Sequence, residues 1–440
     1  MSARTHPDPA FRAADSFYAA TAHPWAGAPA LAGDTTCEVA VIGGGFAGLW
    51  CARRLAAQGK QVLLLEGGEI GRAASGRNGG FVSVGFAAGL DEIERKLGRD
   101  DARALFRLSD AGRQTVRDFC RETPDLGIAP VDGRLKVLRH ADDGALKARV
   151  ETLNAELGQD MVYWPRDKVR DHLKTDTYHE AMEDRQGFHV HPLNLARALA
   201  ADCVARGVTV HEHSPVTALD RDDTGWKITT PGGTVRASQV VLAGNVAAGG
   251  EGASVWPALS RAIVPVATYV VTTERMGAKL HDAIRWSGSV SDTRRAGDYY
   301  RIVDGDRLLW GGRITTRVSE PTDLAETMRA DIERIYPQLA PVKIAHVWTG
   351  LMGYCRHKMP ILGELAPGLW ACTAFGGHGL NTTATGGEAV ADAIVGTDDR
   401  VKLFAPYRAL WGGGPVGRIA TQLEYWRLQA LDWLEERRAA

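Results

Sequence analysis

A glycine-rich turn between a buried strand and a helix constrains the fold of this chain more than any other feature. The expected elements are a strand over 38–42, a helix over 48–58 and a second strand over 61–65. Gly43, Gly45 and Gly48 form G-x-G-x-x-G between the first strand and the helix. Without side chains there, the backbone can approach a pyrophosphate closely, and the helix N-terminus faces its negative charge. This βαβ unit predicts the first half of a dinucleotide-binding fold.

An acidic residue and a second glycine-rich segment narrow the choice of dinucleotide. Glu66 ends the second strand, where a carboxylate accepts hydrogen bonds from a ribose. Taken alone, the motif is also compatible with a plain turn beside a solvated Glu66 and does not separate NAD from FAD. The segment Ile70–Gly80 reads I-G-R-A-A-S-G-R-N-G-G, and its small residues allow backbone amides to meet a long cofactor and a flat ring. A mobile surface loop is the alternative; the segment favours FAD.

Charge and cysteine usage limit the partners of the chain. The 440 residues are enough for two or three structural units, and 52 basic residues balance 53 acidic ones. This balance argues against nucleic acid and anionic membranes and favours a small-molecule substrate. The six cysteines have neither metal-ligand nor disulfide spacing, and no apolar run approaches the roughly 20 residues of a membrane span. We expect no metal, no transmembrane segment and a reducing, cytoplasmic location.

The two ends of the chain need separate consideration. Charged residues such as Arg4, Asp8 and Arg12 interrupt any apolar core of a secretory signal, so we do not expect export. The stretch 423–434 is rich in tryptophan, leucine and arginine, and either lies on a membrane surface or packs on its own domain. We expect it to pack on its own domain.

The order of helical and strand patterns predicts an α/β protein with two interleaved domains. A Rossmann-like FAD-binding domain is expected to alternate with a discontinuous α+β substrate domain built on a mainly antiparallel sheet. The FAD-binding domain would take residues 38–90, 187–258 and 346–440, the last with the C-terminal helices. The substrate domain would take residues 91–186 and 259–345.

Several longer motifs resemble those of the D-amino-acid-oxidase-like flavoprotein superfamily, and most closely its γ-glutamylputrescine oxidase branch. They are D-S-F-Y-A-A-T from Asp15, V-I-G-G-G-F-A-G-L from Val41, A-S-G-R-N-G-G from Ala74, Y-Y-R-I-V from Tyr299, L-L-W-G-G-R from Leu308 and F-G-G-H-G-L from Phe375. The resemblance covers nearly the whole chain. It implies bound FAD and oxidation of an amine to an imine, which water hydrolyses to a carbonyl compound and a smaller amine.

The motifs and the resemblance together give a set of cofactor-binding candidates. Arg77 and Asn78 either lie against the isoalloxazine or satisfy carbonyls of their own loop, and the sequence leaves both interpretations open. The candidates are Gly43, Gly45, Phe46, Ala47, Gly48, Glu66, Gly67, Arg72, Ala74, Ser75, Gly76, Arg77, Asn78, Gly79, Gly80, Val216, Gly244, Gly353, Gly376, Gly377, His378, Gly379, Leu380, Asn381 and Thr382.

The glycine-rich loop at 376–379 precedes a predicted helix and is expected to lie beside the flavin ring. Helix N–H groups there would stabilise negative charge on the reduced ring, and Thr382 or Thr383 would cap the helix. His378 is expected to tune the flavin or contact substrate; a loop histidine that only binds backbone is the alternative. Acid–base chemistry by His378 is not expected, because amine oxidation chiefly needs a deprotonated amine held in a dry pocket.

Two further positions are candidates for contact with the substrate or the flavin. Tyr300 and Arg301 are proposed beside the substrate, although strand alternation places Tyr299 and Arg301 on one side and Tyr300 on the other. Cys355 lies where some relatives attach flavin covalently, but Y-C-R-H-K-M-P does not closely reproduce their pattern. We therefore expect a buried, unmodified Cys355 and noncovalent FAD, with covalent attachment as the alternative.

The leading functional hypothesis is an FAD-dependent amine oxidase that reduces oxygen to hydrogen peroxide. Its candidate substrates are γ-glutamylated polyamines or N-substituted amino acids. An amine or amino-acid dehydrogenase with another electron acceptor and a noncatalytic flavin-binding redox sensor are the alternatives. The sequence does not indicate an oligomeric state.

Overall fold

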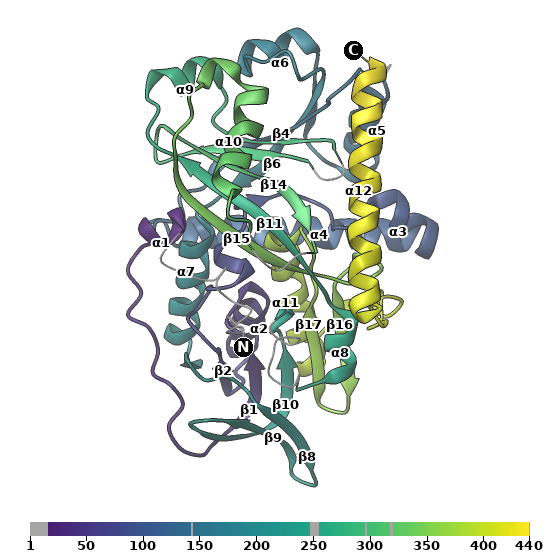
Figure 1. Cartoon of the computed structure of the whole chain (residues 1–440). Coiled ribbons are helices and arrows are strands. Elements are labelled where there is room, and N and C mark those ends of the chain that lie inside the picture. Colours follow the sequence, from purple (N-terminus) through teal and green to yellow (C-terminus); the bar gives the residue numbers. More distant parts are fainter. Residues whose placement is uncertain (1–15, 142–143, 247–254, 295–296, 317–319, 440) are drawn as a thin grey trace.

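Two β-sheets, each covered by its own helices, make up the molecule (Figure 1). The computed structural model describes residues 16–439 except 142–143, 247–254, 295–296 and 317–319. The first sheet lies in the lower half of Figure 1 and the second sheet in the upper half. This mixed α/β architecture is the fold class that the sequence predicts.

The first sheet is mostly parallel and begins with the predicted βαβ unit. Within the described residues its strands follow the order β16–β17–β10–β1–β2–β7, with β9 on β10 and β8 on β9. Only β16 and the β8–β9 hairpin run antiparallel to their neighbours. The strands are β1 (Thr35–Ile42), β2 (Val62–Leu65), β7 (Thr209–His211), β8 (Ala218–Asp222), β9 (Gly225–Thr230), β10 (Gly233–Leu242), β16 (Ile361–Ala366) and β17 (Leu369–Thr373).

Helices on one face of the first sheet bury the largest core of the molecule. They are α2 (Phe46–Ala57), α4 (Arg99–Glu122), α7 (Pro192–Ala205) and α11 (Gly379–Val395). All four residues of β2 are buried, as expected for a parallel strand covered on both faces. Close packing between α2 and α11 depends on Gly387, where a Cβ would lie 2.8 Å from the backbone nitrogen of Cys51. The N-terminal and C-terminal thirds of the chain therefore form one layer.

The second sheet is antiparallel except for the β4–β12 pair, as predicted for the substrate domain. Its order is β15–β11–β14–β13–β12–β4–β6–β3, with β5 on β6. The strands are β3 (Phe81–Val82), β4 (Val131–Val137), β5 (Met161–Trp164), β6 (Ala181–His189), β11 (Val264–Thr273), β12 (Ser289–Asp292), β13 (Tyr299–Val303), β14 (Arg307–Thr315) and β15 (Ile344–Tyr354). β15 lies wholly in this sheet, so the chain leaves it after Tyr354 rather than at the expected 345.

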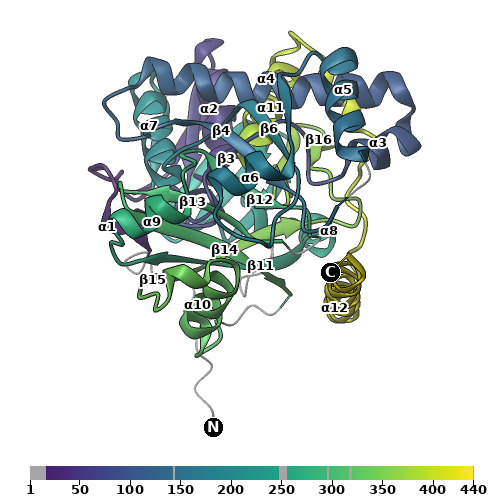
Figure 2. The ribbon, with the colours of Figure 1, turned by 90° about the horizontal axis from the view of Figure 1, so that it is seen from above.

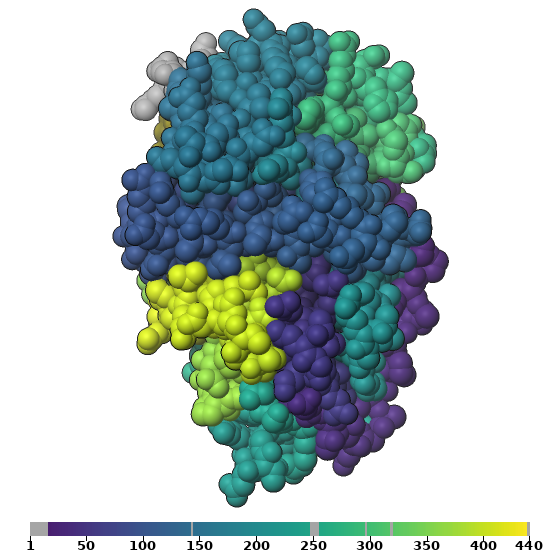
Figure 3. All heavy atoms as spheres, turned by 180° about the vertical axis from the view of Figure 1, so that it is seen from behind, coloured from purple at the N-terminus to yellow at the C-terminus, as the bar shows by residue number. Residues whose placement is uncertain are grey.

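Most of the remaining helices surround the second sheet and the junction, whereas the helix over 257–262 packs against the first sheet. Figure 3 shows residues of α3 and α4 as a blue band across the back of the molecule, between the two halves. Gly98, with φ of 85°, separates α3 from α4. These remaining helices are α1 (Phe17–Ala20), α3 (Leu90–Leu97), α5 (Ala145–Leu157), α6 (Arg166–His172), α8 (Pro257–Ala262), α9 (Ala278–Ala283), α10 (Leu324–Ile335) and α12 (Gly414–Ala439).

The C-terminal helix α12 stands at the edge of the molecule, beside the second sheet (Figures 1 and 2). We expected it to pack on the FAD-binding domain, but it contacts the domain of the second sheet instead, and does so with polar residues: Gln422 accepts a hydrogen bond of 2.9 Å from the backbone N–H of Thr316, and Glu436 binds Arg139 at 2.9 Å. Apolar side chains of α12 face outward. In the part of the chain that the structure describes, no helix combines the length and apolarity that crossing a membrane requires.

Candidate active site

The turn after β1 is built so closely that side chains are excluded from it. Gly43 has φ of 117°, and a Cβ there would lie 2.8 Å from the carbonyl carbon and oxygen of Ala243 at the end of β10. A Cβ on Gly48 would lie 2.0 Å from the carbonyl oxygen of Gly43. These two glycines are therefore required by packing. Gly45 differs, because the nearest atom to a Cβ there is the Ser75 Oγ, at 2.9 Å.

Gly45 also lies at the N-terminal end of α2, where it caps the helix without a side chain. The Phe46 N–H donates to Ser75 Oγ at 2.9 Å, which joins this turn to the loop 70–80. The combination of an open glycine and a helix N-terminus fits the pyrophosphate of FAD, since it offers both space and positive potential. Ala47 follows in the same buried first turn.

Glu66 folds back against the glycine turn from the end of β2. Its carboxylate accepts hydrogen bonds from the N–H groups of Gly44 at 2.6 Å and Gly68 at 2.9 Å. Burial raises the pKa of Glu66, and these two backbone donors oppose that rise. Gly67 lies against Pro215, and Gly68 packs on the side chain of Arg72. The acid is thus held beside the turn at the place where a dinucleotide ribose is expected.

The loop 70–80 is fixed by its own side chains. Asn78 donates to the carbonyl oxygens of Ala74 at 2.9 Å and Ser75 at 2.8 Å, and its side-chain oxygen accepts from the Gly80 N–H. Arg77 is 3% exposed and donates through Nε to the Thr349 carbonyl at 2.8 Å. Asn78 therefore binds carbonyls of its own loop, the second of the two interpretations that the sequence left open, whereas Arg77 binds a carbonyl of β15; contact of either residue with the isoalloxazine stays a prediction. The loop presents mainly backbone.

Three other cofactor candidates lie around these loops. Gly244 follows β10, and its nitrogen would be 3.0 Å from a Cβ on Gly43. Gly353 on β15 accepts a hydrogen bond of 3.0 Å from the Gly376 N–H, which joins the glycine-rich loop 376–379 to the second sheet. Val216 packs against the core under the first sheet. The fold thus brings Gly244 and Gly353 next to glycines of the two loops.

The loop before α11 ends in a helix N-terminus without a side-chain cap. Thr382 and Thr383 do not cap it as expected: their hydroxyls donate to the carbonyls of His378 and Gly379, four residues earlier. Among the residues that the structure describes, no side chain therefore caps the first N–H groups of α11. Asn381, 1% exposed, donates to the carbonyls of Gly85 and Ser109, and so holds this helix against α4.

His378 is held by backbone in a single protonation state. Its Nε2 lies 3.1 Å from the Val84 carbonyl and 3.2 Å from the Ser83 carbonyl, so this nitrogen carries the proton and donates. Burial, together with the nearby charges of Arg134 and Lys136, lowers the pKa of His378 to about 4. The imidazole is therefore neutral near pH 7.

The structure gives Tyr300 and Arg301 packing roles. Tyr300 is fully buried in the core of the second sheet, where its ring stacks on Trp310 with centroids 4.5 Å apart and its hydroxyl lies 2.7 Å from that of Tyr336. Arg301, 5% exposed, donates to the Gly79 carbonyl at 2.9 Å and to the Tyr18 hydroxyl. Neither lines the cavity described next; Tyr299, which strand alternation places on the opposite face from Tyr300, does. We therefore remove both from the catalytic candidates.

A cavity of about 320 Å³ opens between the loop before α11 and the second sheet. Tyr354 of β15 touches the glycine loop, since a Cβ on Gly377 would lie 2.7 Å from its hydroxyl. Burial raises the pKa of Tyr299 and of Tyr354, so both phenols stay protonated at neutral pH. The lining residues are Phe86, Ala87, Arg134, Lys136, Ser291, Asp292, Arg294, Gly297, Asp298, Tyr299, Tyr354, Gly377 and His378.

Most of these residues were missed by the sequence reasoning. Asp292 and Asp298 both form ion pairs with Arg294, the first at 2.8 Å. Arg134 and Lys136 alternate with the buried Leu135 and Val137 on β4, a pattern that indicates one charged face on a strand. That signal was present in the sequence, but nothing local shows which loop the charged face meets.

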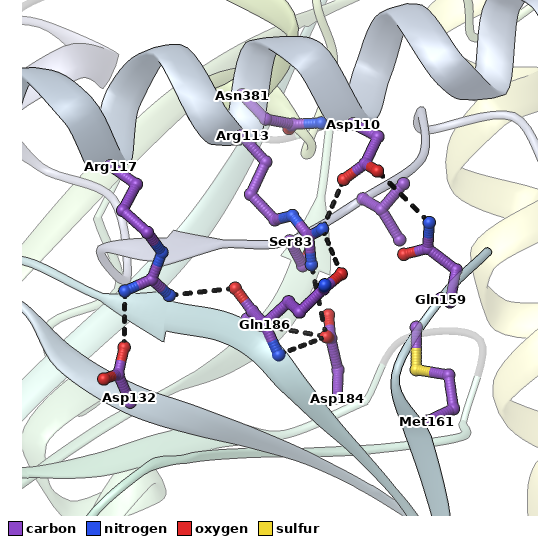
Figure 4. Close-up of polar contacts among 12 residues, drawn as sticks. Ser83, Asp110, Arg113, Arg117, Asp132, Gln159, Met161, Asp184, Gln186 and Asn381 are labelled. Atoms are coloured by element: carbon purple, nitrogen blue, oxygen red, sulfur yellow. Dashed lines mark hydrogen bonds and ion pairs between the residues drawn. The ribbon is translucent and has the colours of Figure 1, made fainter. Parts of the chain in front are cut away.

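A polar network behind the cavity fixes α4 against the second sheet (Figure 4). Arg113, which is buried, binds Asp110 and the side chain of Gln186, and lies 3.4 Å from Asp184. Arg117 binds Asp132 at 2.7 Å. Among the described residues, no group of histidine, cysteine and acidic side chains could hold a metal ion.

Cys355 lies in a buried position next to the glycine-rich loop 376–379. Its thiol is 3% exposed, donates to the Met359 carbonyl at 2.9 Å and lies 3.3 Å from Nδ1 of His357. Burial raises the pKa of the Cys355 thiol to about 12, so it is protonated at neutral pH. Lys358 pairs with Glu92 at 3.4 Å on the surface.

Comparisons with known proteins agree with an FAD-binding site at these glycine-rich turns. Residues 38–393 match the family of FAD dependent oxidoreductases. The chain is 32% identical to the gamma-glutamylputrescine oxidoreductase of Escherichia coli over 90% of its own length and 93% of that protein, and 31% identical to a probable oxidoreductase of Haemophilus influenzae, over 88% and 90%.

Solved structures show the same fold at lower identity. An L-amino acid deaminase from Proteus myxofaciens superposes with a TM-score of 0.71 at 18% identity, covering 88% of this chain and 96% of that one. A glycine oxidase from Bacillus cereus does so with a TM-score of 0.66 at 22% identity, covering 83% and 97%. From the family match and from glycine turns that leave room for a dinucleotide, we conclude that this chain belongs to the FAD dependent oxidoreductases.

Proposed function

We propose that this protein is an FAD-dependent amine oxidase. It would remove a hydride from the carbon next to a primary or secondary amine and a proton from the nitrogen, which gives an imine; oxygen takes both electrons and two protons and becomes hydrogen peroxide. Water then hydrolyses the imine to a carbonyl compound and a smaller amine. Its candidate substrates are γ-glutamylated polyamines or N-substituted amino acids.

The cavity between the loop before α11 and the second sheet is the observation that carries this proposal. One end meets Gly377 and Tyr354, beside the uncapped N-terminus of α11. FAD, when bound, supplies the hydride acceptor. The N–H groups of α11 are suited to stabilise the negative charge that the acceptor gains, while Tyr299 and Tyr354 exclude water and orient the amine. The similarity to gamma-glutamylputrescine oxidoreductase supports an amine as the substrate.

The residues around the cavity fit a reaction that needs no protein base. His378 is neutral and donates its only N–H to backbone carbonyls, so it holds the loop instead of transferring protons. The phenols of Tyr299 and Tyr354 are protonated. A substrate amine that enters in its neutral form already has the lone pair that helps the hydride to leave.

FAD is proposed to bind without a covalent link. The protonated, buried thiol of Cys355 is bound to a backbone carbonyl and is a poor nucleophile. The loops 43–48 and 70–80, together with Glu66, would hold the pyrophosphate and ribose instead.

Anaerobic mixing of the purified, FAD-loaded protein with a panel of amines tests the proposal. Bleaching of the flavin absorbance by at least one amine, followed by hydrogen peroxide on admitting air, is the expected result. Bleaching without peroxide would point to a dehydrogenase with another acceptor. Persistent colour across γ-glutamylated, N-substituted and simple amines would favour a noncatalytic flavin protein and reject the proposal.

A further inference from the structure

Two basic side chains of β4 face the cavity without a carboxylate partner. Arg134 and Lys136 project from the face of the strand that lines the cavity, while Leu135 and Val137 between them enter the core. Burial lowers the pKa of both groups. Such cations are costly to bury unless something compensates their charge.

Within the part of the chain that the structure describes, that compensation is incomplete: the charge of Asp184 opposes the lowering of the Arg134 pKa and that of Asp292 the lowering of the Lys136 pKa, but neither carboxylate forms an ion pair with these groups. Arg134 donates to the Ser291 hydroxyl at 3.2 Å, but its Nε has no hydrogen-bond partner. Lys136 forms neither a hydrogen bond nor an ion pair with any described residue. Asp184 is the register partner of Arg134 on β6, yet its Oδ1 pairs with Arg113 and with backbone N–H groups, and its Oδ2 makes no hydrogen bond to Arg134 or to any other described residue.

The acidic residues of the cavity are already paired. Asp292 and Asp298 share Arg294, and Asp292 also lies 3.8 Å from Arg139. Arg139 also pairs with Glu436, so the charge balance follows from the lining itself, where the basic Arg134, Lys136 and Arg294 face the acidic Asp292 and Asp298. The cavity as a whole is positive and suited to an anion.

The sheet register fixes the distance between the backbones of Lys136 and Tyr299. Ser291 pairs with Tyr299 on one side and with Lys136 on the other. Neighbouring strands are about 4.8 Å apart, so the backbones of Tyr299 and Lys136 are about 10 Å apart across the sheet. An anion bound by Lys136 is therefore several bonds away from a group held against Tyr299.

We propose that Arg134 and Lys136 bind a carboxylate at the end of the substrate remote from the reacting amine. The substrate class is then a long-chain amine with a distal carboxylate, rather than a simple polyamine or a short α-amino acid. This inference rests on the proposed amine oxidation and adds the residues that select its substrate.

A matched pair of substrates tests it: γ-glutamylputrescine and the same molecule with its carboxylate converted to a carboxamide. In the wild type, kcat/KM from anaerobic flavin reduction is expected to be about 10- to 100-fold higher for the carboxylate, since a charge-assisted contact is lost in the amide. Lys136→Met should remove most of that preference by lowering kcat/KM for the carboxylate alone, and Lys136→Arg should restore it. Lys402→Met, on the exposed surface, is the control.

A binding measurement separates this inference from the proposed function. Hexanoate, which carries a carboxylate but no amine, is expected to raise the Tm of the holoenzyme, and hexanamide is not; Lys136→Met should abolish the hexanoate effect. If hexanoate stabilises the wild type and Lys136→Met equally, or not at all, the carboxylate site is rejected. If no amine reduces the flavin while the hexanoate effect holds, the amine oxidation fails and the anion site stands.

A second surface carries an independent inference. The outward face of α12 exposes Val416, Ile419, Leu423, Trp426 and Trp433, each by at least half. With Ala430 between the tryptophans, their spacing alternates between three and four residues, which is the repeat of a coiled-coil seam.

Net charge on α12 does not favour a membrane surface as the occupant of this seam. Glu424 and Arg427 on the exposed side pair with each other at 2.7 Å, and the acidic residues of α12 balance its basic ones. Helices that lie on bilayers are instead rich in lysine and arginine on their polar face. In α12 the polar face contacts the rest of the protein, through Gln422 and Glu436.

We infer that α12 pairs with α12 of a second copy, antiparallel across a twofold axis. In that arrangement Trp433 faces Val416, Ile419 faces Ala430 and Leu423 faces Trp426, so each larger side chain meets a smaller one. Half-exposed side chains of this size, together with the neighbouring Leu410, Trp411 and Leu434, provide an area on the order of the 800 Å² per partner of an ordinary interface.

Sedimentation of the full-length holoenzyme tests the pairing. A dimer is expected for the wild type, a monomer with unchanged FAD content for Ile419→Glu and Leu423→Glu, and a dimer for Val204→Glu, an equally exposed apolar position on α7. A wild-type monomer at tens of micromolar, or dimers that survive both α12 substitutions, would overturn it. Binding of such a monomer to phosphatidylglycerol vesicles would show that the apolar face of α12 binds a membrane instead of a second copy.

Discussion

The cofactor cradle and the substrate cavity are built from different materials. The cradle consists of backbone from β1, β2 and the loop 70–80, and its critical dimension is the space that glycines leave open. The cavity consists of side chains from the second sheet and from the loops beside it, and its critical property is charge. A cradle of this kind is intolerant of a single Cβ, whereas such a cavity can change its substrate by one substitution without changing its fold.

Gly45→Val is expected to have the largest effect, because it fills the cradle without breaking it. The only atoms near a Cβ at Gly45 belong to the flexible side chain of Ser75, so the protein should fold while losing essentially all FAD. Flavin absorbance relative to protein absorbance measures occupancy, and circular dichroism measures the fold.

Gly89→Val is the matched control, since Gly89 has φ of −67° and open space around it, and it should keep full occupancy. A folded Gly45→Val protein with normal flavin content would remove the pyrophosphate from this turn. In contrast, Gly48→Ala is expected to damage folding itself, because its Cβ meets the Gly43 carbonyl oxygen.

Glu66→Gln should weaken FAD binding by about 10- to 100-fold, the effect of losing charge-assisted hydrogen bonds. A glutamine offers one acceptor to the N–H groups of Gly44 and Gly68, where the carboxylate offers two. Since burial raises the pKa of Glu66, FAD affinity of the wild type should fall as pH is lowered through that raised value. Titration of the apoprotein with FAD between pH 4 and pH 8 checks both points, and an equally pH-dependent Gln variant would contradict the second.

The sequence predicts the cradle well because every part of it is local. Strand, glycines, helix and Glu66 lie within thirty residues, and each has a direct physical meaning. The cavity has no such signature, since Lys136 and His378 line it together only because segments far apart in the sequence fold side by side. Tyr300 illustrates the same limit: alternation shows that Tyr299 and Tyr300 face opposite sides, but only the position of Trp310 on β14 decides which side is core.

The pH dependence of flavin reduction should show that the cavity, not a protein base, controls the substrate amine. Burial and the positive charge of Arg134 and Lys136 disfavour an ammonium, so the pKa of the bound amine is lowered and the reduction rate rises with pH, at most tenfold per unit. His378, with a pKa of about 4, is neutral from pH 6 to pH 9 and does not contribute to this pH dependence.

Stopped-flow reduction from pH 6 to pH 9 with a confirmed substrate provides the measurement. The midpoint of the rise should lie below the solution pKa of the amine and stay in place in His378→Asn. A limiting rate that falls as pH rises would contradict the neutral-amine mechanism. A midpoint that moves with His378→Asn would return that residue to the reaction.

Tyr300→Phe separates core from cavity by an effect on stability alone. Removing the hydroxyl leaves that of Tyr336 buried without this partner, which should lower the free energy of unfolding by about 1–2 kcal/mol. Flavin content and kcat/KM should stay within twofold of the wild type, because the ring remains stacked on Trp310. Urea unfolding together with steady-state kinetics distinguishes this from a catalytic loss, which would restore Tyr300 to the pocket.

Cys355→Ala is expected to have the smallest effect, and it tests whether the cradle alone retains FAD. The thiol is protonated, since burial raises its pKa to about 12, and it donates to the Met359 carbonyl, so it has no free thiolate to attack a flavin. Acid denaturation should release all yellow colour into the supernatant from wild type and variant alike, and the variant should lose only about 1 kcal/mol of stability for a small buried side chain. Colour that stays with the precipitated wild type but not with Cys355→Ala would show a covalent bond. The backbone cradle would then share its task with the side chain of Cys355, and the sharp division between the two regions would fail at that residue.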